Sequence, residues 1–434
     1  MNDSTLENKF NQLEEENKRL RVAVEELSVL NDIATAITST KSLENIVDLI
    51  VQKCVKHINV EQGAVMLLDE KDVENPFHTM IRKQDSVIRG LPYRLDTQLT
   101  GWMMKNKAPL RINDFGNDER FNWLAEKDIP IHSLLSVPLI LKGKMVGIIT
   151  VFNKRNHADF SADDQRLLSI IAAQSAHVIE NARLYEEEQA LLRFQEEMRL
   201  ARDIQLNLLP ATIPEIPGYQ ISGKTIPAKD VGGDYYDFIP LDENTLAFCL
   251  GDVSGKGIPA ALLMANLQAT LRNQSKAGTC CRDCITKANT FLFQSTDSKK
   301  FATLFYGILN FKENEFVYCN AGHDNPFLFS ANDEPVRLQA GGIVLGFIPE
   351  YNFAEEKVPF PPGGLLVIYS DGITEAMNSR EEEFGESRLA EIISRNGDRS
   401  AEQIASAILD EIDTYVGDIP PMDDKTIVVI KREP

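Results

Sequence analysis

Cysteine is scarce in this sequence, and its scarcity narrows the possible architectures. The 434 residues include six cysteines, which are too few to build a disulfide framework in a chain of this length. Three of the six stand together in the segment Cys280-Cys281-Arg282-Asp283-Cys284. A zinc site there would need further ligands, and no histidine is near in the sequence. We therefore favour buried or surface thiols of a helix over a metal or redox site.

Long apolar runs and positive charge are also scarce. No apolar run approaches the roughly 18 residues of a membrane span, and the first residues lack the basic and apolar regions of a signal peptide. We therefore expect a soluble, cytoplasmic protein. The 45 basic residues are outnumbered by 65 acidic ones, which leaves a net charge of -20. An acidic surface repels nucleic acid and anionic lipid, so we expect neither as a partner.

The length predicts two or three domains, and residues 1–31 have the repeat of a coiled-coil helix. Leucine recurs every seven residues and asparagine occupies two of the alternate positions; the two sets are Leu6, Leu13, Leu20, Leu27 and Phe10, Asn17, Val24, Asn31. Asparagine at such a position costs stability but favours a parallel, in-register pair. We therefore predict a parallel homodimer. The alternative is a lone amphipathic helix that packs on its own domain.

Residues 32–183 have the pattern of a small α/β domain. Short apolar runs predict strands, the Lys142-Gly143 pair predicts a tight hairpin, and helical spacing predicts a closing helix. These segments are Gly63–Leu68, Ser133–Leu141, Lys144–Phe152 and Ala162–Arg183. We expect a small sheet that is covered by a starting and a closing helix.

This stretch resembles a GAF domain over nearly its whole length. The resemblance rests on Leu99-Thr100-Gly101-Trp102, Ala108-Pro109-Leu110, Asp114, Phe121, Ser136-Val137-Pro138-Leu139 and Gly147-Ile148-Ile149-Thr150-Val151. It implies a sensory domain that binds a small-molecule ligand, or one that only dimerises.

Part of the motif of cyclic-nucleotide GAF domains is also present. Asn153, Lys154, Phe160 and Asp164 match its Asn-Lys…Phe…Asp-Glu pattern, whereas Gln165 stands in place of the glutamate. The same residue types serve in turns and helix caps, and we favour that role over cyclic-nucleotide binding.

Residues 184–209 are predicted to form a charged helical linker. A second, weaker apolar seam runs along it with three–four spacing, through Leu191, Phe194, Met198, Ala201, Gln205 and Leu208. Pro210, Pro214 and Pro217 then end the helix, because proline lacks the backbone donor and clashes with the preceding turn. In a dimer such a helix can transmit a rotation or a register shift. The alternative is a plain spacer.

Aspartates beside strong strands are the main chemical signal in residues 210–432. Asp234, Asp252 and Asp371 lie beside glycines at the ends of predicted strands, and Asp423 stands just before the last one. An ionised carboxylate at a buried strand end is costly unless it is paired or metal-bound. Mg²⁺ and Mn²⁺ prefer oxygen ligands. A turn can explain any one of these aspartates, but the set of four favours a site for hard cations.

The same segment resembles the PPM (PP2C-type) serine/threonine phosphatases, in the bacterial branch that contains the SpoIIE and RsbU phosphatases. The matching motifs run through almost all of 200–432: Ala201-Arg202-Asp203-Ile204-Gln205, Leu208-Leu209-Pro210, Val231-Gly232-Gly233-Asp234-Tyr235-Tyr236-Asp237, Gly251-Asp252-Val253-Ser254-Gly255-Lys256-Gly257, Phe301-Ala302-Thr303, Asn320-Ala321-Gly322-His323, Leu345-Gly346, Ser370-Asp371-Gly372 and Asp423-Asp424-Lys425-Thr426. The resemblance implies a PP2C-like β-sandwich flanked by helices. The whole chain is then an α/β (α+β) multidomain protein: coiled coil, GAF domain, helical linker and phosphatase domain.

The resemblance also implies two divalent cations, Mn²⁺ or Mg²⁺, and assigns their ligands. Asp234 would bind one cation, Asp252 would bridge both, and the carbonyl of Val253 would complete one shell. Asp371 and Asp423 would hold the other cation. Two such cations activate a water for direct hydrolysis of a phosphoserine or phosphothreonine ester.

Several neighbouring residues have more than one possible role. Asp424 competes with Asp423 as the last ligand, and Asp237 suits a structural role better. Eukaryotic PP2C enzymes have a histidine just after the bridging aspartate, which this chain lacks. His323 is the candidate replacement, although a structural role is favoured. Lys256 either contacts phosphate or substrate, or sits on the first turn of the helix that follows.

Three functions compete at this point. The favoured one is a sensor-regulated protein phosphatase, whose family implies a phosphorylated STAS-domain protein, an anti-sigma-factor antagonist, as substrate. A nucleotide cyclase is suggested by Gly232-Gly233-Asp234, but Tyr235-Tyr236 follows where that motif has Glu-Phe. The third is a signalling scaffold with a degenerate phosphatase domain. The presence of all four aspartates argues against degeneracy.

Overall fold

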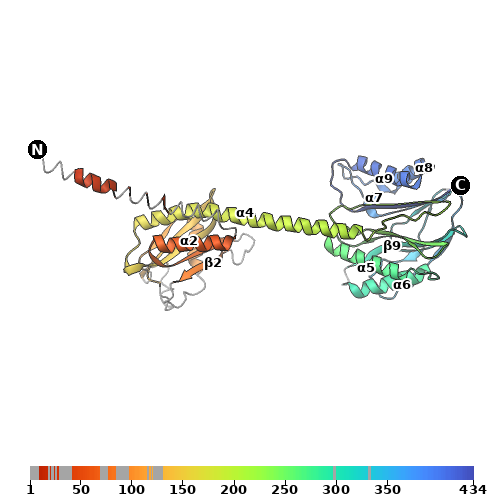
Figure 1. Cartoon of the computed structure of the whole chain (residues 1–434). Coiled ribbons are helices and arrows are strands. Elements are labelled where there is room, and N and C mark those ends of the chain that lie inside the picture. The colour runs from red at the N-terminus through yellow and green to blue at the C-terminus, as the bar shows by residue number, and fades with distance from the viewer. Residues whose placement is uncertain are drawn as a thin grey trace. The chain divides into compact units, whose positions relative to one another are not determined.

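The computed structural model describes residues 9–17, 20, 24, 27, 28, 42–68, 77–84, 97–114, 117, 118, 120, 131–296, 300–330 and 334–434. The chain divides into two compact units, Met1–Arg193 and Phe194–Pro434 (Figure 1). None of the helices in these described ranges is both long enough and apolar enough to cross a membrane.

The N-terminal unit is built on one antiparallel sheet with the strand order β2-β1-β5-β4-β3. The strands are β1 (Val60–Leu68), β2 (Phe77–Gln84), β3 (Leu110–Ile112), β4 (Leu134–Leu141) and β5 (Lys144–Lys154). Apolar side chains of one face pack against α2 (Leu43–His57) and the first part of α4 (Ala162–Leu206). The other face packs against α3 (Thr97–Asn106). The predicted sheet covered by helices is confirmed.

The predicted hairpin at Lys142-Gly143 is also confirmed. β4 and β5 pair from Leu141 opposite Lys144 onward, so the loop has two residues. Lys142 and Gly143 have φ angles of 48° and 82°, the left-handed conformation that a two-residue turn needs to match the strand twist.

The predicted coiled coil lies only partly within the described residues. Residues 9–17 are helical, as are 20, 24, 27 and 28, and the remainder of 1–31 lies outside the described part. The heptad side chains that are described, Phe10, Leu13, Leu20, Val24 and Leu27, are exposed. The coiled coil and the parallel homodimer therefore stay predictions.

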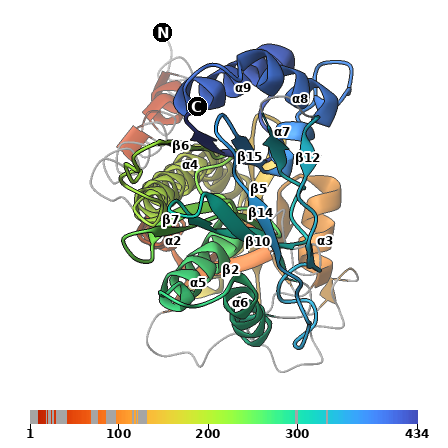
Figure 2. The ribbon, with the colours of Figure 1, turned by 90° about the vertical axis from the view of Figure 1, so that its right-hand side faces the viewer.

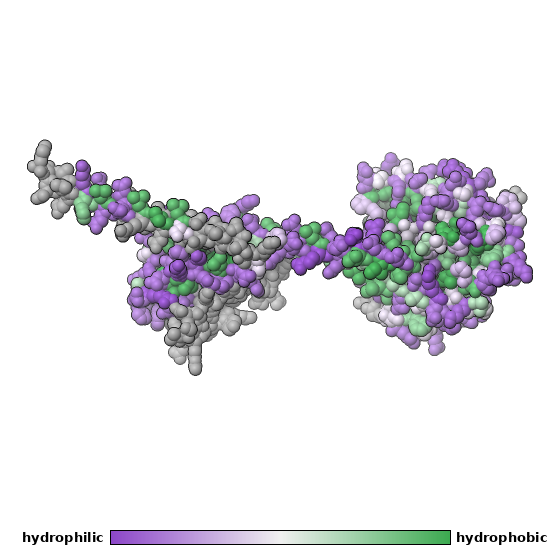
Figure 3. Space-filling model, in the orientation of Figure 1, coloured by the Kyte–Doolittle hydropathy of each residue, from purple (hydrophilic) through white to green (hydrophobic). Residues whose placement is uncertain are grey.

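One helix, α4, covers both the predicted closing helix and most of the predicted linker. Its first half buries Leu168, Ile171 and Ile179 in the N-terminal unit. From Leu184 onward it carries exposed apolar side chains (Figure 3), which include Leu191, Phe194 and Leu200. The helix ends at Leu206, four residues before Pro210.

The C-terminal unit is a sandwich of two sheets. One sheet has the order β13-β10-β9-β8-β7, with β14 also paired to β10, and the other has the order β12-β11-β15-β16-β6. The first contains β7 (Tyr235–Pro240), β8 (Thr245–Val253), β9 (Ala302–Asn310), β10 (Glu315–Ala321), β13 (Gly341–Gly342) and β14 (Glu356–Pro359). The second contains β6 (Tyr219–Ile226), β11 (Phe327–Phe329), β12 (Val336–Arg337), β15 (Leu365–Tyr369) and β16 (Lys425–Arg432).

Helices cover the outer faces of this sandwich, as Figures 1 and 2 show. α5 (Ile258–Gln274) and α6 (Cys281–Ser295) lie on the first sheet, and α8 (Gly385–Asn396) and α9 (Ala401–Val416) lie on the second. β15 serves both layers, because Leu366 and Ile368 enter the core between the sheets while Val367 packs under α8 and α9. The predicted β-sandwich flanked by helices is the observed architecture.

The cysteines of α6 are part of its packing. Cys281 and Cys284 are free and buried, and burial raises the pKa of both thiols. High thiol pKa values disfavour the thiolate that metal binding and redox chemistry require. Their place on a buried helix face agrees with the interpretation as helix thiols.

An ion pair between a buried carboxylate and a half-exposed arginine ties the first sheet to α5. Asp237 of β7 is fully buried, and its two carboxylate oxygens accept hydrogen bonds from Arg272 at 2.6 and 3.1 Å. Tyr235 donates a further hydrogen bond at 2.6 Å, and the amide of Phe238 donates one at 2.8 Å. With both oxygens engaged in this way, Asp237 has a structural role.

We expect Arg272→Ala to lower the free energy of unfolding by about 2 kcal/mol, because the buried carboxylate of Asp237 loses its hydrogen bonds to a charged partner. Arg395→Ala is the matched control. Its pair with Glu411 is exposed on both sides, so its loss costs about 1 kcal/mol or less. Urea denaturation of both full-length variants measures the difference, and equal costs would show that Asp237 does not depend on Arg272.

Candidate metal centre

The four predicted aspartates come from both sheets of the sandwich. Asp234 directly precedes β7, and Asp252 is the penultimate residue of β8. Asp371 begins the short helix α7 (Asp371–Thr374), two residues after β15, and Asp423 lies two residues before β16. β7 pairs with β8, and β15 pairs with β16. Residues almost 190 positions apart in the sequence are thus brought to one edge of the sandwich.

Asp424 shows directly that the two sheets meet at this edge. Its Oδ1 accepts a hydrogen bond from the amide of Ala228, and its Oδ2 accepts one from the amide of Gly233, each at 2.8 Å. Asp424 is buried, whereas the side chain of Asp423 is 39% exposed. The carboxylate of Asp424 is thereby used for backbone amides, and Asp423 is the freer of the two.

Two glycines allow the loop before β7 to lie this close. A Cβ atom on Gly232 would come within 2.0 Å of the Oδ2 atom of Asp424. A Cβ atom on Gly233 would come within 2.7 Å of the carbonyl oxygen of Val253 and 2.9 Å of the Oδ1 atom of Asp252. The Gly232-Gly233 pair therefore brings the predicted ligands Val253 and Asp252 against the residue that precedes Asp234.

Burial and mutual repulsion hold the pKa values of these carboxyl groups high. Burial first, and then the charges of Asp371, Asp423 and Asp424, raise the pKa of Asp252 to about 7. Burial and the charge of Asp252 raise the pKa of Asp234 well above its ordinary value. The pKa of Asp371 is also raised, by burial and by the charge of Asp423. Carboxyl groups that resist ionisation in this way are typical of functional sites.

Lys256 contributes positive charge at the exposed side of the site. Its Nζ lies 2.9 Å from the Oδ2 atom of Asp423, and the pair raises the pKa of the lysine. The lysine precedes α5, which begins at Ile258 after Gly257. Lys256 thus contacts the predicted ligand Asp423 rather than only starting the helix.

His323 lies close to the site but is not charged. It is buried, its Nδ1 lies 2.9 Å from the Oγ1 atom of Thr303, and that oxygen accepts a hydrogen bond from the amide of Asp252 at 3.3 Å. Burial lowers the pKa of His323 to about 4. At neutral pH the ring is therefore a neutral imidazole, which makes it a poor general acid. The hydrogen bonds of Asn320 to the backbone of His323 support the structural role.

The donor chemistry of this edge fits a hard divalent cation. The oxygens are carboxylates that repel one another, and the Oδ2 atom of Asp234 is buried with no hydrogen-bond partner in the described part of the chain. Among the described residues, no three His, Cys, Asp or Glu side chains converge closely enough to enclose an ion in this conformation. An oxygen set with uncompensated charge and an unpaired buried acceptor is the chemistry that Mg²⁺ and Mn²⁺ satisfy.

Gln205, near the end of α4, is a site neighbour for which the sequence analysis predicted no specific role, although it belongs to the 201–205 motif of the phosphatase resemblance. Its Nε2 donates to the carbonyl of Gly232 at 2.7 Å, and its Oε1 accepts from the amide of Gly232 at 3.0 Å. Helical spacing had assigned Gln205 to the apolar seam of the linker. The polar side chain within an apolar seam was the available signal that it has another partner.

The partial cyclic-nucleotide motif is used within the GAF-like unit. Lys154 forms an ion pair with Asp164, which also accepts from the amide of Ser161 at 2.7 Å. Asn153 accepts from the amide of His132 at 2.8 Å and donates to Glu61 at 2.9 Å, and Phe160 is buried. These residues have the turn and helix-cap contacts that the sequence analysis favoured.

The chain matches two family models. The model described as Stage II sporulation protein E (SpoIIE) matches residues 242–433, and a model of the GAF domain matches residues 40–180. The two models therefore cover the C-terminal and N-terminal units in turn.

Curated relatives and solved structures agree with these models. Phosphoserine phosphatase RsbU of Bacillus subtilis is 31% identical over 255 residues, which are 57% of this chain and 75% of RsbU. Protein IcfG of Synechocystis sp. is 30% identical over 263 residues, 54% of this chain and 41% of IcfG. The SiaA-PP2C domain of Pseudomonas aeruginosa, at 20% identity, has the same fold with a TM-score of 0.50, over 56% of this chain and 99% of that domain.

Replacing Gln205 tests whether it holds the loop before β7. We expect Gln205→Ala to speed amide hydrogen exchange in residues 228–236 by about tenfold or more, because two hydrogen bonds of about 1 kcal/mol each are lost. Asn207→Ala is the matched control, since Asn207 is exposed near the same helix end. Amide exchange is measured by mass spectrometry on the full chain. Wild-type exchange rates in both variants would contradict the prediction.

The raised pKa of Asp252 predicts a pH-dependent stability of the metal-free protein. A carboxyl group whose pKa rises from 3.8 to about 7 on folding binds more protons in the folded state between those values. Its contribution to stability therefore falls as pH rises through that window. We expect Asp252→Asn to melt at least about 3 °C above wild type near neutral pH in EDTA.

The difference in melting temperature between wild type and Asp252→Asn should shrink as the pH falls toward about 4, where the side chain at position 252 is neutral in both folded proteins. Asp398→Asn changes an exposed carboxylate outside the site and serves as the control. A difference that stays constant over this pH range would show that Asp252 does not titrate as its surroundings indicate.

Proposed function

This chain belongs to the family of the RsbU and SpoIIE phosphatases, PPM-type protein phosphatases, with a GAF domain ahead of its phosphatase domain, and we propose that it hydrolyses a phosphoserine or phosphothreonine on a partner protein by a two-metal mechanism. One observation supports the mechanism: Asp234, Asp252, Asp371 and Asp423 lie at the same edge of the sandwich, and the pKa values of the first three are raised.

Each proposed ligand has a position that suits its role. Asp252 is proposed as the bridging ligand, because it is close to the loop that carries Asp234 and is also under the influence of the charges of Asp371 and Asp423. The carbonyl oxygen of Val253 faces the same loop. Asp423 is proposed over Asp424 because the oxygens of Asp424 accept backbone amides. When bound, Mn²⁺ or Mg²⁺ would lower the pKa of a water and neutralise charge on the phosphoryl group.

The remaining residues limit how the reaction can proceed. His323 is neutral because its pKa is about 4, so we assign protonation of the leaving hydroxyl to solvent rather than to this ring. Lys256 is the cation at the exposed side of the site. With a cation held by Asp423, the ammonium group of Lys256 would be free to contact a phosphate oxygen.

The regulation and the partner are also proposals. Membership of the RsbU family supports a phosphorylated STAS-domain protein as substrate and a cytoplasmic location. The GAF domain would bind a small molecule, and the coiled coil and α4 would carry its effect through a parallel homodimer. Gln205 supports the last step, since it joins α4 to the loop of Asp234.

A signalling scaffold with an inactive phosphatase domain is the alternative. The four aspartates are all present and share one edge of the sandwich, which favours an active enzyme. Metal-dependent hydrolysis of a simple phosphate ester separates the two functions, since a scaffold would show none.

We expect the full chain to hydrolyse p-nitrophenyl phosphate and a phosphoserine STAS protein only with Mn²⁺ or Mg²⁺. Asp252→Ala should lower kcat/KM by about 1,000-fold or more, which corresponds to about 4 kcal/mol of transition-state stabilisation. Asp398→Ala, an exposed carboxylate elsewhere on the unit, should retain the wild-type rate. Equal rates for wild type and Asp252→Ala would rule out the two-metal site at this edge.

A further inference from the structure

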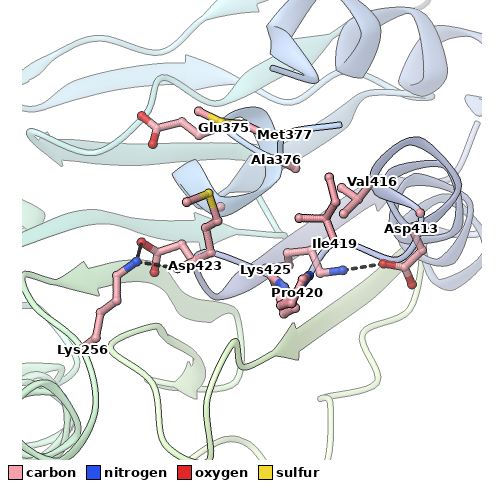
Figure 4. A pocket seen from close by; sticks show the side chains of 14 residues that line it. Lys256, Glu375, Ala376, Met377, Asp413, Val416, Ile419, Pro420, Asp423 and Lys425 are labelled. Carbon is pink, nitrogen blue, oxygen red and sulfur yellow. Dashed lines mark hydrogen bonds and ion pairs between the residues drawn. The ribbon is translucent and has the colours of Figure 1, made fainter. Parts of the chain in front are cut away.

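An apolar cavity adjoins the candidate metal centre. Its volume is about 430 Å³, and α7, the end of α9 and the segment 417–423 enclose it (Figure 4). Its apolar walls are formed by Ala376, Met377, Val416, Ile419, Pro420 and Met422. We call this cavity the Met422 pocket. Its size lies within the range of roughly 300–1,000 Å³ that is usual for ligand pockets.

The Met422 pocket is continuous with the site, because Asp423 and Lys256 line it as well. Figure 4 shows the Lys256–Asp423 pair on one side of the pocket and the Lys425–Asp413 pair on the other. Lys425 is therefore neutralised by Asp413, and apart from Glu375 the side chains that line the space between the two ion pairs are apolar. Whatever occupies this space lies beside a proposed metal ligand.

The walls suit an adaptable apolar side chain. Met422 is 66% exposed, so its side chain is accessible to a partner at the pocket. Methionine is flexible and polarisable, so it fits partners of varied shape. Among the charged side chains that line the pocket, three carboxylates outnumber two lysines, so the lining as a whole would disfavour an acidic side chain; the carboxylates are Glu375, Asp413 and Asp423, and the lysines are Lys256 and Lys425.

Chain geometry connects the occupant to the phosphorylated residue. An extended chain advances about 3.3–3.6 Å per residue, so a side chain within about three residues of the reacting serine reaches a pocket that shares a wall with the site. Resting on the proposed phosphatase function, we propose that the Met422 pocket binds an apolar side chain of the substrate protein, of the size of leucine or methionine, within about three residues of the phosphorylated serine or threonine.

Synthetic phosphoserine peptides test this directly on the full chain. Each peptide carries a single leucine at one neighbouring position in an alanine host, and the all-alanine peptide is the reference. We expect one position at which leucine raises kcat/KM about tenfold over alanine, the usual scale of discrimination by an apolar pocket. Aspartate at that position should lower kcat/KM below the alanine value.

Variants of the wall should remove this preference. Met422→Ala removes an exposed part of the wall, and Ile419→Trp fills the cavity. The measured quantity is the ratio of kcat/KM for the leucine and alanine peptides within each variant, so that changes in folding or metal binding cancel. We expect this ratio to fall from about ten to about two in both variants. Val336→Ala changes an apolar residue outside the pocket that is also more than half exposed, and it should keep the wild-type ratio.

The outcomes separate this proposal from the phosphatase function on which it rests. If the full chain shows no metal-dependent hydrolysis of p-nitrophenyl phosphate, the proposed function fails and the pocket proposal fails with it. If that ester is hydrolysed but leucine and alanine peptides react equally or not at all, only the pocket proposal is overturned. A leucine preference that both wall variants retain also overturns it. A preference that weakens as enzyme concentration rises would assign the pocket to a second copy of this chain.

Discussion

The hydrogen bonds of Asp424 are the contacts on which the arrangement of the candidate site depends. Its carboxylate accepts amides of Ala228 and Gly233 in the loop before β7, and its carbonyl accepts a hydrogen bond from Ser370 before α7 at 3.1 Å. One residue thus joins the start of β16 to the loop that connects β6 to β7, and to the start of α7. Hydrogen bonds to a charged acceptor are roughly twice as strong as neutral ones. Asp234 and Asp371 keep their positions through this residue.

The site concentrates negative charge where the fold alone would avoid it. Buried carboxyl groups with raised pKa values oppose folding at neutral pH, and the large cores on both sides of the second sheet must offset that cost. The Oδ2 atom of Asp234 has no hydrogen-bond partner within the described residues, and Lys256 pairs with Asp423 at the exposed side of the site. Divalent cations would relieve the repulsion. We therefore expect the stability of this site to depend on the ions that it is proposed to bind.

The sequence predicted the strands and the position of the aspartates at their ends, since both follow from local patterns. An apolar run that ends at an aspartate beside glycine marks a strand end, and the set of four in one domain favours a site for hard cations. The choice between Asp423 and Asp424 depended on which carboxylate accepts amides almost 190 residues away, and no local pattern contains that contact. Gln205 was assigned to the apolar seam of the linker because helical spacing shows which side chains share a helix face, but not what that face contacts. The Met422 pocket has walls from three separate segments, so it also had no signature in the sequence.

The contact between α4 and the loop of Asp234 sets the scale of control that the linker can exert. Gln205 makes two hydrogen bonds to Gly232, worth about 1 kcal/mol each. Their loss would change the population of the held loop about 30-fold, which lies within the 5–150-fold range of typical allosteric couplings. The core need not deform, because Leu209 stays packed in it just beyond the helix. A signal carried by α4 would therefore need only to move Gln205 out of hydrogen-bonding reach to change the geometry of a proposed metal ligand.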